Sequence, residues 1–596
     1  MPRRMHRTLT SVFLIFLLCL AVYLNSFSTS LHFDDFFAIT GNAAVRDITD
    51  VGQIFRVFPG RFLLMFSFAV NYAIHGADPT GYHVANFLFH LINAVLLYFI
   101  TFMLMVASRT TQDDEMFGHV PLIVALLFAI HPILTESVTY ISGRTSSLAA
   151  VFFLLSLLLY MGSVMDQRGD GSREKSMFVR TFLYSGSLLV FFLSLWVKES
   201  NVTIPAILLI LDFCFVEESR WNKLKNSLKR VFPFFVVVAA ILLWRRMYIG
   251  AVGEPRAIRG TAENVYTQMQ VIISYLRLVL IPVGQNIDHD YPLSQSLFEP
   301  KTLLSVIFLF VLALTAILRL NKNKVISFGI LWWLITLAPT SSVIPLWDIM
   351  SERWIYLSSI GILLVGAAFL REVYALAPQV SFRRRLANGA VIAIILALSA
   401  LTITRNSVWK TEYTLWTDAV QKSPDKARPH TNLGMALVER GDLEGAAREV
   451  ETALALDPQL PEAAFSLASI NLYKGKYDET IAVLNATFAR FPDDSQVPVR
   501  IAHAFAKARF NLGLAYFHKG EYSRAIAEYE SALRLAPYLP WTHNNLGAAY
   551  EALGEYELAI AEYEKEFALN PGFVQARQNI ENIRRRLNGG SGESDD

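Results

Sequence analysis

Two acidic residues stand directly after the first long apolar run, where they could act as a general base or bind a metal ion. Asp34 and Asp35 lie between Phe33 and Phe36. Adjacent carboxylates repel each other, and partial burial between bulky apolar residues should raise the pKa of one of them, which suits a general base or a metal ligand. Acidic pairs also cap helices or sit in water, so the pair by itself leaves both interpretations open.

Cations and further carboxylates recur at the ends of later apolar runs, and all of them are expected on the same side of a membrane. They are His83, His131, Glu136, Arg144, Lys198, Glu199, Glu352 and Arg353. Arginine binds a phosphate through two parallel hydrogen bonds, whereas lysine acts as a point charge. Each residue has a structural alternative, such as a histidine that satisfies a backbone group or a lysine that reaches the interface. Their common side favours one site with carboxylates for proton transfer and cations for an anion.

Metal binding has weaker support. Asp288-His289-Asp290 could hold a divalent cation, but the spacing matches no specific motif and a hydrated loop is favoured. The only two cysteines, Cys19 and Cys214, both lie inside apolar runs, which excludes a disulfide framework and a cysteine-based zinc site. No metal ligand is therefore assigned.

Composition places these residues in a membrane protein. Of the 596 residues 53% are apolar and 17% charged, and the mean hydropathy is +0.37, which excludes a single soluble enzyme. A membrane-spanning helix needs about 20 apolar residues. Eleven runs are expected to cross the membrane: 9–27, 82–106, 120–138, 146–165, 178–197, 202–217, 231–249, 301–320, 325–344, 355–371 and 387–404. Two less apolar segments, 61–75 and 265–283, are expected to lie in the outer interface.

Basic residues set the orientation. The first run follows Arg3, Arg4 and Arg7 and is interpreted as an uncleaved anchor. With the N-terminus in the cytoplasm, clusters such as Lys322 and Lys324 also fall on the cytoplasmic side. Eleven crossings then place the candidate site and the C-terminal part of the chain outside the cytoplasm.

The C-terminal part repeats with a period of 34 residues. Asn-Leu-Gly triplets begin at Asn432, Asn511 and Asn545, and prolines recur in phase with them. This pattern is typical of tetratricopeptide repeats, in which small residues lie where two helices cross. The solenoid presents a concave surface for a polypeptide, although a rigid spacer is the alternative. A net charge of −8 from residue 411 onward, against +10 before it, argues against nucleic acid as a partner.

The predicted fold is all-α and has two domains. The polytopic membrane domain covers 1–408, with long outside loops at 28–81 and 250–300. The repeat domain covers 409–587, and an acidic tail covers 588–596. Within the repeat domain we expect a half-repeat at 411–424, repeats that start near 427, 461, 506 and 540, an insertion at 496–505 and a capping helix at 574–587.

The order of these motifs resembles a known family. It resembles integral-membrane glycosyltransferases of the C-type fold, and within them the transmembrane and tetratricopeptide-repeat-containing family. The resemblance covers nearly the whole chain. The motifs that carry it are Phe33-Asp34-Asp35, Gly81-Tyr82-His83-Val84-Ala85-Asn86, His131-Pro132, Thr135-Glu136, Gly143-Arg144, Lys198-Glu199 and Glu352-Arg353-Trp354, followed by the repeats.

The resemblance implies an inverting hexosyltransferase. It would move a sugar, expected to be mannose, from a polyprenyl-phosphate donor to a Ser or Thr hydroxyl, with the repeats binding the acceptor polypeptide. Asp34 or Asp35 would be the base. The lipid phosphate would be bound by Arg144, Lys198 and Arg353, with His83 and His131 as further contacts. Glu136, Glu199 and Glu352 would orient the cations.

The resemblance also leaves alternatives open. The small number of repeats favours a bacterial relative in the inner membrane with periplasmic repeats, whereas a eukaryotic protein would have luminal repeats in the endoplasmic reticulum. The same fold could instead glycosylate a lipid or polysaccharide. A third interpretation is a membrane-anchored scaffold without catalytic activity, in which changes at Asp34, Asp35 and Arg144 leave function intact.

Overall fold

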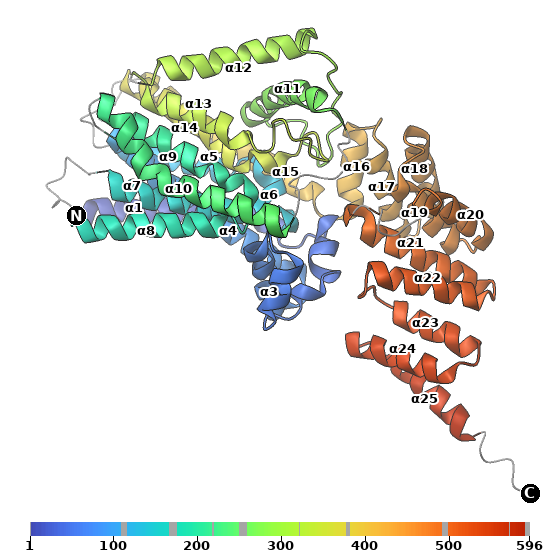
Figure 1. Cartoon of the computed structure of the whole chain (residues 1–596). Coiled ribbons are helices and arrows are strands. Elements are labelled where there is room, and N and C mark those ends of the chain that lie inside the picture. The colour runs from blue at the N-terminus through green and yellow to red at the C-terminus, as the bar shows by residue number, and fades with distance from the viewer. Residues whose placement is uncertain are drawn as a thin grey trace, which may run out of the picture. The chain divides into compact units, whose positions relative to one another are not determined.

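The computed structural model consists of two compact helical units (Figure 1). It describes residues 2–108, 116–165, 176–216, 220–249, 259–320, 322–376, 382–491, 497, 499–570 and 572–589. The membrane unit comprises Met1–Ile39 and Ala44–Thr411, and the repeat unit comprises Glu412–Asp596 with the short segment Thr40–Ala43. Parts of the expected loop at 250–300 and most of the expected acidic tail lie outside the described residues.

The described part of the membrane unit contains helices joined by irregular segments, with no strand there. Its α-helices are α1 (Pro2–Tyr23), α2 (Val51–Val57), α3 (Phe62–His75), α4 (Pro79–Ala107), α5 (Met116–Ala129), α6 (Thr135–Val138), α7 (Arg144–Val164), α8 (Met177–Ser194), α9 (Ile204–Phe215), α10 (Arg220–Tyr248), α11 (Thr261–Leu280), α12 (Pro300–Leu318), α13 (Lys324–Leu337), α14 (Ile355–Ala375) and α15 (Phe382–Val408). Short 3₁₀ turns at Ile141–Gly143, Glu199–Thr203 and Glu352–Trp354 precede α7, α9 and α14.

Eight helices in the described ranges are long and apolar enough to cross a membrane, and a bent pair of helices could supply a ninth. The pair is His119–Ala129 with Pro132–Val138, and it bends by 50°. Of the eleven expected spans, 202–217 and 325–344 correspond to α9 and α13, which have 12 and 14 residues. A helix of 14 residues is only about 21 Å long, shorter than the hydrocarbon layer. The protein is a multi-pass membrane protein with fewer full-length spans than the apolar runs predict.

Close backbone contact fixes the helix that begins at the candidate site. α13 crosses α14 at Gly329 and Gly361, where a Cβ atom on Gly329 would lie 2.5 Å from the carbonyl oxygen of Gly361. Beside this crossing, Trp332 and Trp333 are fully buried. Small residues of this kind let membrane helices approach and pack without a hydrophobic driving force. The start of α14, which follows Arg353, is therefore held by tight packing.

The described residues of the repeat unit form one single helix, four helix pairs and a final helix. They are α16 (Glu412–Lys422), α17 (Ala427–Glu439) with α18 (Leu443–Leu456), α19 (Pro461–Tyr473) with α20 (Tyr477–Phe488), α21 (Val499–His518) with α22 (Tyr522–Leu535), α23 (Thr542–Ala552) with α24 (Tyr556–Leu569), and α25 (Val574–Gly589). The third pair begins earlier than the expected start at 506, because residues 499–505 of the insertion form the first turns of α21. Phe505 there is buried, with its ring centroid 4.7 Å from that of Phe488.

The repeat glycines lie where the sequence pattern predicts them. A Cβ atom on Gly434, Gly513 or Gly547 would approach the side chain 16 residues later on the paired helix, at 2.5 Å for Gly434 against Val450 and 2.6 Å for Gly513 against Tyr529. The small residue is thus required by the helix crossing within each repeat. The predicted fold class, a polytopic all-α membrane part followed by a tetratricopeptide-repeat solenoid, is confirmed.

Candidate active site

The loop after α1 turns the two adjacent carboxylates in different directions. Phe33 has a φ of +44°, a backbone conformation that bulky residues rarely adopt and that is common at functional sites. The Asp35 N–H then donates to the His32 carbonyl at 2.8 Å, while the His32 N–H donates to Asp35 Oδ2 at 3.0 Å. Asp35 is fully buried, whereas the Asp34 side chain is 49% exposed. Of the two carboxylates, Asp34 is therefore the one accessible from solvent.

Asp35 fastens the loop to the start of α7. Its Oδ1 accepts hydrogen bonds from the Ser142 N–H at 2.7 Å and from Ser142 Oγ at 2.5 Å. The adjacent Gly143 permits this arrangement, because a Cβ atom there would lie 2.2 Å from the carbonyl oxygen of Glu136. Asp35 acts as a positioning residue for Asp34 in this geometry.

Burial raises the pKa of Asp35 to about 7, although the hydrogen bonds from Ser142 and the proximity of His32 lower it in part. In the unfolded chain this carboxyl group ionises near pH 4. Between these two pH values the unfolded chain releases a proton that the folded protein keeps. The contribution of Asp35 to the free energy of unfolding is therefore greatest below pH 4 and falls as the pH rises toward 7.

We therefore expect the unfolding temperature of the wild type to fall between pH 5 and pH 7.5 more steeply than that of Asp35→Asn, which cannot ionise. The full effect of this group on the free energy of unfolding is on the order of 4 kcal/mol, because folding raises its pKa from near 4 to about 7. Thermal unfolding followed by intrinsic fluorescence across this range measures it. Parallel profiles for the two proteins would contradict the assignment.

Arg353 is the cation nearest to the open carboxylate. Its Nη1 lies 3.7 Å from Asp34 Oδ2, its Nε lies 3.7 Å from Glu136 Oε1, and its Nη2 lies 3.7 Å from Asp348 Oδ2. The side chain is 24% exposed, so it faces a partly solvated space and also three carboxylates. One guanidinium thus lies within 4 Å of three carboxylates.

Glu136 contacts both the backbone and the side chain of Arg353. The buried carboxylate accepts hydrogen bonds from the Arg353 N–H and from Ser351 Oγ, both at 3.0 Å. It comes from the short helix α6, far from Arg353 in sequence. The structure therefore places Glu136 where it can orient Arg353, and the orienting role that the resemblance implies stays a prediction.

Lys198 shares a pocket with Arg353. The pocket is lined by residues of α7, α13 and α14 and of the turns before α9 and α14, including Ser146, Lys198, Asn201, Thr340, Arg353 and Tyr356. Lys198 Nζ donates to Ser146 Oγ at 2.9 Å, and Ser146 Oγ donates to the Arg353 carbonyl at 2.8 Å. Two cations that are 155 positions apart in sequence thus line the same hollow. The pair matches the expected charge of a phosphate site.

Polar contacts between helices keep this hollow in place. His90 Nδ1 and Tyr356 Oη lie 2.7 Å apart, and Asn93 Nδ2 donates to Tyr356 Oη at 3.0 Å and to the Ser147 carbonyl at 2.8 Å. These contacts join α4, α7 and α14. In a membrane protein such groups are stable only when they find partners within the protein.

Glu352 faces away from Arg353 and binds the loop after α11. Its Oε1 accepts from the Asn286 N–H at 2.7 Å and lies 3.0 Å from His289 Nε2. Glu352 is expected to orient the cations of the site, and its contacts seen here are instead with the loop that carries His289. In the described part of the chain no group of three or more His, Cys, Asp or Glu residues could hold a metal ion, so the geometry does not single out Asp288-His289-Asp290 as a cation site.

Arg144 has an environment that favours packing over phosphate binding. It is fully buried, and Nε donates to Asn86 Oδ1 at 2.7 Å, Nη1 to the Ser67 carbonyl at 3.1 Å and Nη2 to the Tyr82 carbonyl at 3.1 Å. Its guanidinium carbon also lies 4.4 Å from the centre of the Phe68 ring. Each nitrogen already has a protein acceptor, so the residue joins α3 and α4 to α7. Its predicted role toward the donor phosphate has no support in this geometry.

The two candidate histidines are also buried, and both form hydrogen bonds within the protein. His83 Nε2 lies 2.8 Å from Thr29 Oγ1, and His131 Nε2 lies 2.9 Å from the Val279 carbonyl. Neither lines the pocket of Lys198 and Arg353. Their predicted contact with phosphate or sugar stays a prediction, and the contacts seen are those of interhelical connections.

Glu199 pairs with cations that the sequence did not single out. Its Oε1 lies 2.9 Å from Arg245 Nη1 and 3.5 Å from Arg61 Nε. Although burial opposes ionisation, these two guanidiniums hold the pKa of Glu199 down to about 2. Glu199 thus pairs with Arg61 and Arg245, and its charge also acts on Lys198. Its predicted orienting role toward Lys198 stays a prediction.

Two aromatic residues that support the acidic loop also escaped the sequence analysis. The Asp34 N–H donates to Tyr140 Oη at 3.0 Å, and the Tyr140 ring stacks on Trp409 with centroids 5.5 Å apart. His32 Nε2 lies 2.5 Å from the Trp409 carbonyl. Trp409 follows the last membrane helix in a sequence that simply turns polar, so only the fold reveals this contact. Asp348 likewise carries no signal except its position shortly before Arg353.

Known proteins resemble both parts of the chain. Models of tetratricopeptide repeats match residues 431–495, 513–554 and 542–573. Protein O-mannosyl-transferase Tmtc3 of Drosophila melanogaster is 26% identical over 510 residues, which cover 74% of this chain and 54% of that protein. Human protein O-mannosyl-transferase TMTC4 is 22% identical, with 72% of this chain and 63% of that protein covered.

The chain is homologous to these protein O-mannosyl-transferases. The family resemblance drawn from the sequence motifs is thereby confirmed. The chain spans between half and two thirds of the length of these two relatives. Mouse protein O-mannosyl-transferase TMTC2 is 31% identical over 39% of this chain and 28% of its own length. Among solved structures, a crystal structure of MamA is 21% identical and covers 27% of this chain and 89% of its own, with a TM-score of 0.23.

Proposed function

We propose that the protein transfers mannose from a polyprenyl-phosphate carrier to Ser or Thr hydroxyls of a polypeptide. The observation that carries this proposal is that the half-exposed Asp34 lies beside Arg353. Arg353 lines a pocket that Lys198 also lines. The homologues are named protein O-mannosyl-transferases, and that name supports the sugar and the protein acceptor. A pocket with two cations suits a donor that is linked through phosphate.

In the proposed reaction Asp34 is the general base. The acceptor oxygen attacks the anomeric carbon while its proton passes to the Asp34 carboxylate. The bond between the anomeric carbon and the phosphate oxygen breaks, and its electron pair stays on the phosphate. Arg353 and Lys198 stabilise the charge that develops there. This single displacement inverts the anomeric centre, and the freed carrier leaves as polyprenyl phosphate.

The remaining charged groups position this machinery. Glu136 and Asp348 hold the Arg353 guanidinium, and Asp35 holds the loop that presents Asp34. The proposed site faces the non-cytoplasmic side, because the basic loops lie at the other membrane end. That side is the periplasm in a bacterium and the lumen of the endoplasmic reticulum in a eukaryote. The tetratricopeptide repeats are proposed to bind the acceptor polypeptide.

The test is to incubate purified protein in membranes with radiolabelled polyprenyl-phosphate mannose and an unfolded secreted polypeptide. Label that enters the protein fraction as acid-stable, β-eliminable sugar supports the proposal. Label that enters only lipid or polysaccharide would assign the same fold to another acceptor. A protein that transfers no label from mannose, glucose or N-acetylglucosamine carriers, and yet assembles a membrane complex through its repeats, would instead be a scaffold.

Lys198 gives the proposal a pH signature. Burial lowers the pKa of this lysine to about 7, with the nearby Arg353 and Arg61 acting in the same direction. The carboxylates of Glu199 and Glu136 oppose this shift in part. The lysine is thus charged below pH 7 and neutral above it in the free protein. We expect kcat/KM for the polyprenyl-phosphate donor to fall by about tenfold above pH 7, which corresponds to the loss of one hydrogen bond to a charged group.

The matched variant is Lys198→Arg, which stays charged at every pH used. Its profile should be flat between pH 6 and pH 8.5, apart from the ionisation of the catalytic base. The measurement is the initial rate of transfer at low donor concentration across this range. An unchanged fall above pH 7 in Lys198→Arg would remove Lys198 from donor binding.

A further inference from the structure

A second charged pocket lies at the other end of α14. Arg353 precedes the first turn of this helix and Arg371 lies 18 positions later, which corresponds to about 27 Å along a helix axis. The hydrocarbon layer of a bilayer is about 30 Å thick. If Arg353 lies at one membrane interface, Arg371 lies near the other. This second pocket is therefore at headgroup depth on the side opposite the candidate active site.

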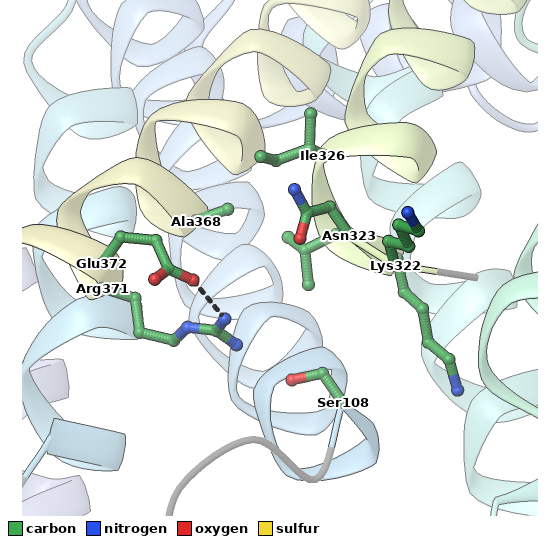
Figure 2. Close-up of a pocket in the computed structure, with 9 residues that line it drawn as sticks. Ser108, Lys322, Asn323, Ile326, Ala368, Arg371 and Glu372 are labelled. Carbon is green, nitrogen blue, oxygen red and sulfur yellow. Dashed lines mark hydrogen bonds and ion pairs between the residues drawn. The ribbon is translucent and has the colours of Figure 1, made fainter. Parts of the chain in front are cut away.

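Three segments surround the pocket. It is lined by Ser108 at the end of α4, by Lys322, Asn323, Lys324, Val325 and Ile326 at the start of α13, and by Ala368, Arg371 and Glu372 of α14. Figure 2 shows Lys322 and Asn323 on one side of the hollow, Arg371 and Glu372 on the opposite side, and Ser108 below them. The residues are distant in sequence and form a pocket only in the folded chain.

The pocket has an excess of positive charge. Arg371 Nη2 pairs with Glu372 Oε1 at 2.8 Å, the contact drawn in Figure 2. Lys322 and Lys324 have no ion-pair partner within the described residues. Both lysines lie at the start of α13, where the helix dipole adds positive potential. The charge of the two lysines is thus available to an anion.

The lining is also amphipathic. Val325, Ile326 and Ala368 form an apolar side next to the charged groups, and Val325 is buried. A soluble anion would gain nothing from an apolar side, whereas a lipid places its phosphate beside its glycerol and acyl carbons. Basic pockets between membrane helices at headgroup depth bind anionic lipids in this manner.

We propose that this pocket binds the phosphate of an anionic phospholipid, with Lys322 and Lys324 as its main contacts. Ser108 and Asn323 supply polar groups at the rim, and the apolar side receives the first carbons of the lipid. The bound lipid would contact the C-terminal ends of α4 and α14 and the start of α13. The site does not depend on the catalytic proposal, because it lies at the opposite end of α14.

The experiment uses the full chain in detergent and counts bound phosphatidylglycerol by native mass spectrometry during a titration. Phosphatidylcholine of the same acyl length is the uncharged comparison. The test variant is Lys322→Gln with Lys324→Gln. The matched control is Arg383→Gln with Arg385→Gln, which removes two exposed charges at the start of α15, outside the pocket.

The expected result is one phosphatidylglycerol that binds the wild type and the control alike, and that binds the lysine variant about tenfold more weakly. Phosphatidylcholine should bind all three proteins equally. Equal loss in the control would reduce the effect to general surface charge and overturn the proposal. Displacement of the lipid by millimolar inorganic phosphate would also overturn it, because the pocket would then be a site for a soluble anion.

Discussion

Replacing Asp34 with asparagine should lower the rate of sugar transfer by about a thousandfold and leave the protein folded. A positioned general base contributes roughly 10² to 10⁴ in rate. Asparagine has nearly the same shape but cannot accept the hydroxyl proton. Because the Asp34 side chain is half exposed and its ion pair with Arg353 is long, at 3.7 Å, the substitution removes no short buried contact. The expected loss is therefore in kcat, with little change in unfolding temperature.

The measurement is transfer of radiolabelled mannose into protein, with the unfolding temperature recorded for each variant. Asp47→Asn is the matched control, since Asp47 lies on the same loop and hydrogen-bonds only locally, to Thr49. It should retain wild-type transfer. Full activity in Asp34→Asn would move the role of base to another group, with Asp35 the next candidate if its buried carboxyl became accessible.

Replacing Arg353 with glutamine should lower transfer by about 10² to 10³, the range seen when one preorganised group that stabilises transition-state charge is removed. In this protein the change has a second cost. Asp34, Glu136 and Asp348 each lie 3.7 Å from the guanidinium, and without it these carboxylates would face one another and the donor phosphate. We therefore expect loss of donor binding together with a slower chemical step.

Arg353→Lys separates charge from geometry. A lysine keeps the positive charge but cannot reach three carboxylates at once through a planar group, so we expect only partial recovery. The control is Arg56→Gln, an exposed arginine in the same half of the membrane unit that pairs with Asp50. A second test combines Arg353→Gln with Glu136→Gln. Because the two residues contact each other, their effects should not add. Additive effects would show that Glu136 does not act through Arg353.

Sequence periodicity and composition determined the architecture because they report local, repeated requirements. Apolar runs predict membrane helices from length alone, and the 34-residue period predicts helix pairs because each repeat must bury the same face. The count of spans was less secure. Helices α9 and α13 are apolar but short, and an apolar run does not show where a helix begins or ends.

The sequence identified the residues of the candidate site, but only the fold shows that the two adjacent acids have different environments. The motif Phe33-Asp34-Asp35 marks a pair of acids, and nothing in it says that Asp35 turns inward to Ser142 while Asp34 stays open. That choice depends on the backbone at Phe33 and on a partner more than a hundred residues away. Trp409, which supports the same loop, comes from the far end of the membrane unit.

The cations show the same limit most clearly. As sequence motifs, Arg144, Lys198 and Arg353 are equivalent positive charges near apolar runs. The fold surrounds Arg144 with carbonyl oxygens and aromatic rings, and brings Lys198 and Arg353 together at one pocket. The sequence by itself determined the helical class, the repeats and the residue types available for chemistry. The tertiary structure alone decided which charges have protein partners and which line a pocket, because the energy of a buried charge depends on neighbours that are distant in sequence.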